Sequence, residues 1–230
     1  MTDLPQSSMR NYTEVLDEMK ADRGYLLSFH QFLSRTNLDY LVAYADYYKN
    51  ATLKTTHLDA QTKETVWIAI LSMVGDAVGS IHIERAIEVG IDQEARESII
   101  RLASRAAVWP YLKTTSENWG RFQMPDPIKA YATVVQKNED YLNLGIRAEL
   151  VMLAASAVLR NKEPFTFHLI NCLEMKFTEA QLVESLTFLV NPLGFNRLQW
   201  ACDTWLKALA DGTITKTELF TDGLPEARVK

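Results

Sequence analysis

The sequence predicts an all-α protein whose single chain contains two similar helical halves. Glycine (9) and proline (7) are few among 230 residues, and the period-two alternation typical of strands is scarce. Two long apolar segments follow the same plan, since Glu64 precedes His82 by 18 residues and Glu149 precedes His168 by 19. In both segments a tryptophan follows the histidine after 37 residues. We interpret these shared offsets as an internal duplication.

Three helices are expected before the first copy, over residues 10–22, 26–33 and 38–48. Gly24 is expected to end the first of them. His30 lies among aromatic and aliphatic residues, where a histidine is more often packed in a core than used as a ligand. The third segment is rich in tyrosine and is therefore a candidate surface for contacts between subunits.

The first copy is expected to begin at Asp59, whose side chain suits the N-cap of a helix. Residues 66–74 are apolar nearly all round, which indicates that the helix over 64–78 is buried on most sides. Further helices are expected around His82 up to Gly90 and from Asp92 to Ala107, after which Trp109-Pro110 closes the half.

A linker is expected at residues 120–126, so that the halves are residues 1–122, with the N-terminal helices, and 123–230, with a polar C-terminal tail. Asp126-Pro127 is a typical helix start. One helix is expected from there to about Tyr141 and another over 146–160. After a turn at 161–164, a helix is expected around His168. Two more are expected, one after a capping box at Thr178 and Gln181 and one over 195–209.

The composition is that of an ordinary soluble globular protein, with 47% hydrophobic and 23% charged residues. A net charge of −5 argues against a general nucleic-acid surface, which needs a basic face. The longest apolar runs are about half of a bilayer span, and the first residues lack the apolar core of a secretory signal. Two cysteines in so long a chain favour a reducing, cytoplasmic location.

The Glu–His pattern resembles the carboxymuconolactone decarboxylase and alkylhydroperoxidase D superfamily over about residues 15–210. Its signature is a glutamate near the start of a buried helix, then a histidine followed at four-residue steps by alanine and glycine. The matching positions are Glu64, His82, Ala86 and Gly90 in the first copy, and Glu149, His168, Cys172 and Lys176 in the second. The Cys-x-x-Cys pair of the peroxidase branch is missing from both copies, so peroxidase chemistry does not carry over.

The resemblance implies an alkylhydroperoxidase D-like fold and assembly into homo-oligomers, as a trimer or a dimer of this duplicated chain. It also implies that each glutamate tunes or orients its histidine. The expected catalytic residues are His168, Glu149, His82 and Glu64. The expected substrate-binding residues are Arg160, Asn161, Lys162, Arg85 and Trp109.

Geometry leaves open how each pair meets. A helix of about twelve residues rises roughly 18 Å, which would place Glu149 at the far end of an ideal hairpin from His168. We therefore expect either a steep helix crossing or a partner from another copy. The second copy is favoured as the working one because its 19-residue spacing is that of the family. No metal is expected, since neither histidine has a second ligand one turn away.

The leading hypothesis is a cofactor-free acid–base lyase, decarboxylase-like, that acts on a small carboxylated lactone or a related cyclic or enone acid. The alternatives are a binding or assembly protein that keeps the fold without catalysis, and a thiol-poor relative of alkylhydroperoxidase that uses Cys172 alone. The expected partners are a small-molecule carboxylate and further copies of the chain, with neither nucleic acid nor membrane.

Overall fold

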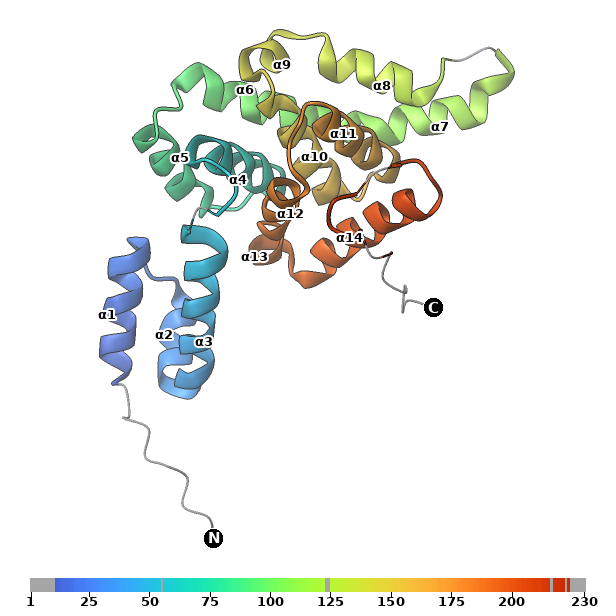
Figure 1. Cartoon of the computed structure of the whole chain (residues 1–230). Helices are drawn as coiled ribbons and strands as arrows, with labels where there is room; N and C mark the ends of the chain where they lie inside the picture. The colour runs from blue at the N-terminus through green and yellow to red at the C-terminus, as the bar shows by residue number, and fades with distance from the viewer. Residues whose placement is uncertain (1–10, 55, 123–124, 216, 222, 224–230) are drawn as a thin grey trace. The chain divides into compact units, whose positions relative to one another are not determined.

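The structure is a computed structural model that describes residues 11–54, 56–122, 125–215, 217–221 and 223. All the regular elements among these residues are helices and none is a strand, which confirms the all-α prediction (Figure 1). No helix in this part of the chain is long and apolar enough to cross a membrane. The chain divides into two compact units, Met1–Thr55 and Thr56–Lys230. The division into duplicated halves at residue 122 is not confirmed and stays a prediction.

The first unit contains the three expected N-terminal helices, α1 (Tyr12–Arg23), α2 (Ser28–Thr36) and α3 (Leu38–Tyr48), followed by a π-helical turn, η1 (Lys49–Leu53). Asn11 and Glu14 form a capping box at the start of α1. Gly24 ends α1 with a φ of 86°, which favours glycine. A small apolar cluster, Val15, Leu16, Met19 and Leu41, joins α1 to α3.

A buried cation organises the polar side of this unit. The guanidinium of Arg23 lies 3.8 Å from the ring centroid of Tyr48 and donates a 2.7 Å hydrogen bond to the hydroxyl of Tyr25. Its Nη1 lies 2.9 Å from Nε2 of His30, which is fully buried, as expected for a core histidine. Because Tyr48 faces Arg23, it is not available as a contact surface, and Tyr40 is the more exposed tyrosine of α3.

The second unit begins with the first buried helix and its neighbours. These are α4 (Ala60–Val74), α5 (Gly79–Glu88), α6 (Gln93–Ser104), the 3₁₀ turn η2 (Arg105–Val108), α7 (Trp109–Trp119) and η3 (Gly120–Phe122). It continues with α8 (Pro127–Gln136), α9 (Glu139–Leu144), α10 (Arg147–Leu159), α11 (Lys162–Glu174), α12 (Glu179–Thr187), α13 (Val190–Leu193) and α14 (Phe195–Ala210). All five tryptophans of the chain belong to this unit.

The helices α4 and α10 form the centre of the second unit, as their apolar sequences predict. Ten residues of α4 and eleven of α10 are buried, and α10 packs against both α4 and α11. A helix without a polar face is stable only when other helices surround it. The expected caps at Asp59 and Asp92 and the capping box at Thr178 and Gln181 are confirmed.

Two expected boundaries were wrong. The first half does not end at Trp109-Pro110, because Pro110 lies in the first turn of α7. An N–H in the first turn of a helix has no acceptor within that helix, so proline is tolerated there. The helix expected from Asp126 to about Tyr141 is interrupted, because the side chain of Asn138 caps a separate helix, α9, by accepting from the backbone N–H of Tyr141.

Candidate functional site

Each glutamate meets its own histidine within one chain. Nδ1 of His168 lies 2.6 Å from a carboxylate oxygen of Glu149, and Nδ1 of His82 lies 2.7 Å from Glu64. The expected separation along the hairpin was overestimated. Glu149 lies ten residues before the end of α10, about 15 Å, but His168 lies six residues into α11, which recovers about 9 Å. Two long side chains span the remainder, so no second subunit is needed.

The carboxylate of Glu149 accepts hydrogen bonds on both oxygens. Besides His168, it accepts from Gln136 at 3.0 Å, from Asn171 at 3.1 Å and from the hydroxyl of Tyr141. Complete burial would raise the pKa of Glu149, but the hydrogen bonds from His168, Tyr141 and Gln136 outweigh burial and lower it. Glu149 is therefore held as an anion in the core.

His168 is hydrogen-bonded through both ring nitrogens. An ionised carboxylate only accepts, so Nδ1 carries the proton that faces Glu149. Nε2 lies 3.1 Å from the hydroxyl of Tyr131, within hydrogen-bond distance. Burial raises the pKa of Tyr131, which keeps its hydroxyl protonated. Glu149, His168 and Tyr131 each have 0% of their surface exposed, and Trp109 packs edge-on against Tyr131.

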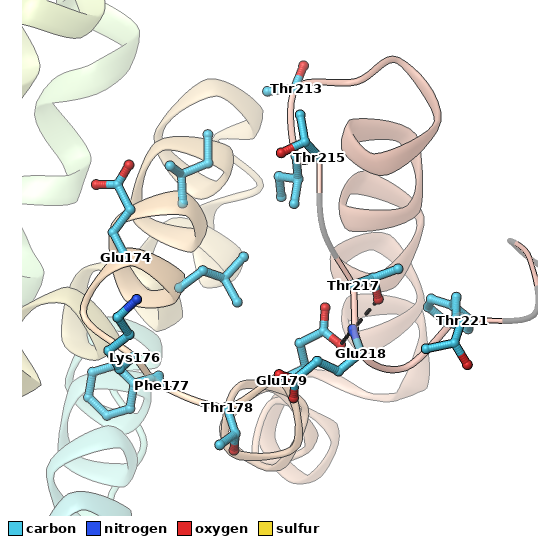
Figure 2. Close-up of a pocket in the computed structure, with 14 residues that line it drawn as sticks. Glu174, Lys176, Phe177, Thr178, Glu179, Thr213, Thr215, Thr217, Glu218 and Thr221 are labelled. Atoms are coloured by element: carbon cyan, nitrogen blue, oxygen red, sulfur yellow. Dashed lines mark hydrogen bonds between the residues drawn. The ribbon is translucent and has the colours of Figure 1, made fainter.

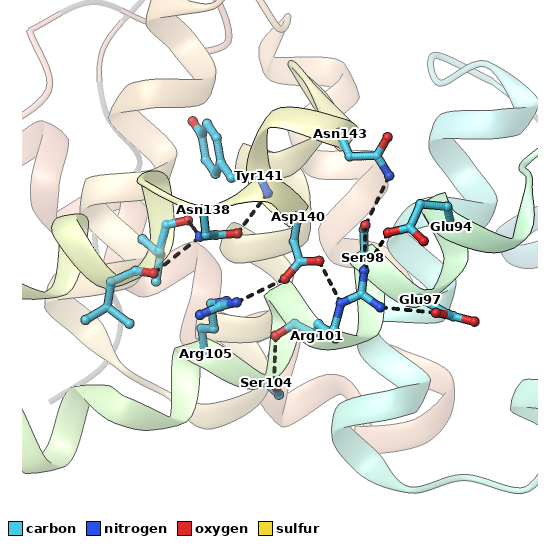
Figure 3. A network of polar contacts seen from close by, with 12 residues as sticks. Glu94, Glu97, Ser98, Arg101, Ser104, Arg105, Asn138, Asp140, Tyr141 and Asn143 are labelled. Carbon is cyan, nitrogen blue, oxygen red and sulfur yellow. Dashed lines mark hydrogen bonds and ion pairs between the residues drawn. The ribbon is translucent and has the colours of Figure 1, made fainter.

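A surface network holds α9, and with it Tyr141, in place (Figure 3). Asp140 accepts from Arg101 at 2.7 Å on one oxygen and from Arg105 at 3.0 Å on the other, which ties α9 to α6 and η2. Asn143 donates to Ser98 of α6 at 3.0 Å. The network therefore fixes the helix whose tyrosine completes the shell around Glu149.

The first pair has different surroundings. The ring of Trp67 stacks on the ring of His82 with 4.5 Å between centroids, and Nζ of Lys63 lies 3.8 Å from the second oxygen of Glu64. Burial lowers the pKa of His82, the bond to Glu64 opposes this effect, and the charges of Arg85 and Lys63 reinforce it. His82 is therefore neutral at pH 7.

Nε2 of His82 is the open position of this pair. Nδ1 carries the proton that faces Glu64, so Nε2 holds a lone pair. The hydrogen bonds among the described residues give Nε2 no partner, whereas 2% of the residue remains accessible. The two Glu–His pairs thus differ in one chemical respect: both ring nitrogens of His168 are hydrogen-bonded, whereas His82 retains a basic nitrogen.

The expected substrate-binding residues do not form one cluster. Arg160 is exposed at the end of α10 with a φ of 56°, and the amide of the buried Asn161 donates to the carbonyl of Ala106. Lys162 lines a hollow of about 320 Å³ on another face of α11, whose lining does not include His168. Only Arg85 lies near its histidine, and Trp109 acts indirectly, behind Tyr131.

Four residues of the second site were missed at the sequence level, namely Tyr131, Gln136, Tyr141 and Asn171. Asn171 carried a signal, because it lies one turn after His168. The other three precede Glu149 by 18, 13 and 8 residues, where the first copy has Asp46, Ala51 and Thr56. A search for repeated residues therefore has no means of detecting them.

The thiols and metal ligands of the chain offer little further chemistry here. Burial raises the pKa of Cys172 well above its usual value, so this neighbour of His168 is a protonated thiol. Both cysteines are free. Among the residues that the structure describes, no three histidine, cysteine, aspartate or glutamate side chains are grouped so as to hold a metal ion.

Comparison of this chain with protein-family models, with curated proteins and with solved structures finds no match. The superfamily resemblance therefore rests on the spacing of its glutamates and histidines.

Proposed function

We propose that this chain is a cofactor-free acid–base enzyme of the lyase class, acting on a small carboxylated lactone or a related cyclic or enone acid, with His82 as its general base. The observation that carries the proposal is the lone pair on Nε2 of His82, which no described residue shares, in a ring that Glu64 orients through Nδ1. A neutral imidazole held in this way is the usual form of a histidine base.

The surroundings of His82 suit an anionic substrate with a flat conjugated system. Lys63 and Arg85 supply positive charge close to the imidazole, which suits a substrate carboxylate. Trp67, which is buried and stacks on both His82 and Phe188, makes the surroundings of the imidazole apolar, and an apolar site favours dispersed charge over a localised carboxylate. Local opening must precede the reaction, because only 2% of His82 is exposed.

The proposal places the base at His82, whereas the 19-residue spacing by itself favours His168. His168 has donors or acceptors on both nitrogens and no exposed surface, so any substrate must first displace Tyr131. We assign the second pair a structural role, that of a buried polar network joining α8, α9, α10 and α11.

A binding or assembly protein without catalysis is the second candidate function. The near-complete burial of both histidines favours it, because a substrate has little direct access to either ring. Assembly into a homo-oligomer and a cytoplasmic location are part of both proposals.

Separate substitutions of the two histidines test the assignment. We expect His82→Gln to lower the turnover of a carboxylated lactone by about 10²-fold or more, because it removes the base. We expect His168→Gln to lower stability instead, with turnover per folded molecule largely kept. Circular dichroism and unfolding curves separate the two effects. Full turnover by a folded His82→Gln protein would refute the enzymatic role of His82 and favour the binding protein.

A further inference from the structure

A second hollow lies outside both histidine sites, between the end of α11 and the chain segment after α14 (Figure 2). Its volume is about 990 Å³, at the upper end of the range typical for small-molecule sites. Ile170, Leu173 and Ile214 form an apolar part of its lining, and Phe177 and Phe220 add two aromatic rings.

The charge of this hollow is mainly negative. Among the described residues of its lining, three are acidic, Glu174, Glu179 and Glu218, and one is basic, Lys176. Glu179 differs from the other two acids because only 4% of it is exposed. One of its oxygens accepts from the backbone N–H groups of Glu218 and Leu219, both at 2.7 Å, and from the hydroxyl of Thr217 at 3.2 Å.

The other oxygen of Glu179, Oε1, is buried and has no hydrogen-bond partner among the residues that the structure describes. An unpaired charged acceptor in a protein interior is costly, and a charged donor removes that cost. Among the described residues no ligand set for a metal ion is present, so the complementary donor is an organic cation rather than a metal. An ammonium group offers three donors and a compact charge.

We propose that this hollow binds a small organic amine, whose ammonium group pairs with Glu179 and whose apolar part lies against the aliphatic and aromatic lining. The rings of Phe177 and Phe220 add attraction for a cation. Because Glu179 also holds residues 217–219, pairing with Oε1 couples occupancy of the hollow to the order of that segment. The site is separate from the proposed base His82.

Three probes of the same size and different charge test the proposal on the full chain by calorimetry: 2-phenylethylamine, 2-phenylethanol and phenylacetate. We expect saturable binding of the amine, at least about tenfold weaker binding of the alcohol, and no binding of the anion. On addition of the amine, hydrogen exchange should slow at residues 217–219. Equal affinity for amine and alcohol, or no saturation by the amine at about 10 mM, would overturn the proposal.

The decisive variant is Glu179→Gln, because its amide oxygen can keep the three bonds to residues 217–219 while its NH₂ group replaces Oε1. We expect amine affinity to fall by at least about tenfold. Glu163→Gln is the matched control, since Glu163 lines the neighbouring hollow and should leave affinity unchanged. If Glu179→Gln does not fold, Thr215→Trp, at an exposed position of the lining, should block binding. Unchanged binding in either folded variant would contradict the proposal.

Discussion

At the scale of single residues, the two copies of the Glu–His pair show how neighbours decide what one side chain can do. Glu149 is surrounded by donors from three other helices, and its histidine is closed off by Tyr131. Glu64 has a lysine beside it, and Nε2 of its histidine has no hydrogen-bond partner among the described residues. The same two residue types therefore give a saturated network in one place and a basic nitrogen in the other.

The first residue-scale prediction concerns the saturated network. We expect Glu149→Ala to reduce the free energy of unfolding by about 3–5 kcal/mol, because it leaves His168, Gln136 and Asn171 without their buried acceptor. Urea unfolding followed by tryptophan fluorescence measures the change. Glu163→Ala, which removes an exposed partner of Lys113, is the control and should cost less than about 1 kcal/mol. A loss of under about 1 kcal/mol for Glu149→Ala would mean that the network is not a stabilising unit.

The second residue-scale prediction concerns pH and His30. Burial, and then the charge of Arg23, lower the pKa of His30 to about 4. The unfolded chain therefore binds a proton between about pH 6.5 and pH 4 that the native state does not bind. Stability of the first unit is present above pH 6.5 and falls as the pH drops through this window, by up to about 3 kcal/mol.

Hydrogen exchange of α1–α3 in the full chain, corrected for the intrinsic pH dependence of exchange, measures this loss. His30→Gln is the matched variant, since it lacks a titrating group and should not show the same slope. An unchanged slope in the variant would assign the pH dependence to other groups.

At the scale of elements, α12 anchors the segment that leads into α4. The carboxylate of Glu184 accepts from the backbone N–H groups of Thr56 at 3.1 Å, His57 at 2.5 Å and Leu58 at 2.9 Å. Successive backbone donors directed at one anion resemble the nests that bind phosphate, with a side chain as the anion. The segment that leads into α4 is thus held by a carboxylate more than 120 residues later in the chain.

We expect Glu184→Ala to increase hydrogen exchange at residues 56–58 and in the first turn of α4. The loss of local protection should be about 1–2 kcal/mol, because the bonds are charge-assisted but partly exposed. Exchange in α10 should change little, since its contacts are apolar. Uniform loss of protection across α4 and α10 would show that Glu184 supports the whole unit rather than one segment.

At the scale of the whole molecule, large apolar side chains remain on the surface. Phe32 is 72% exposed and Tyr40 60% exposed in the first unit, and Phe195 is 67% exposed in the second. Exposed aromatic residues are enriched where subunits meet. We therefore expect light scattering at micromolar concentration to give two or three times 26.2 kDa.

Phe32→Glu and Tyr40→Glu should lower that mass, because a charged side chain at a subunit interface must lose its hydration. Lys20→Glu, an exposed change on α1, serves as the charge control. A particle of 26 kDa in the unmodified protein would refute self-association.

The sequence predicts most of the helices because their signals are local. The caps at Asp59, Asp92 and Thr178 and the apolar runs of α4 and α10 need no tertiary information. The shared offsets singled out the two glutamates and the two histidines, but whether each pair meets within one chain was left open. Tyr131 and Tyr141 were not predictable, because they belong to α8 and α9, and only packing brings these helices to Glu149. The role of Pro110 was misread because the same residue begins helices and ends them.

Because Trp67 stacks on His82, the fluorescence of Trp67 should report the protonation state of His82. An imidazolium in contact with an indole quenches its fluorescence far more strongly than a neutral imidazole does. The emission of Trp67 should therefore dim as acid titrates His82, at a pH below the usual range because the pKa of His82 is lowered. In a protein whose other four tryptophans are replaced by phenylalanine, a dye-free titration would read the protonation state of the proposed base directly.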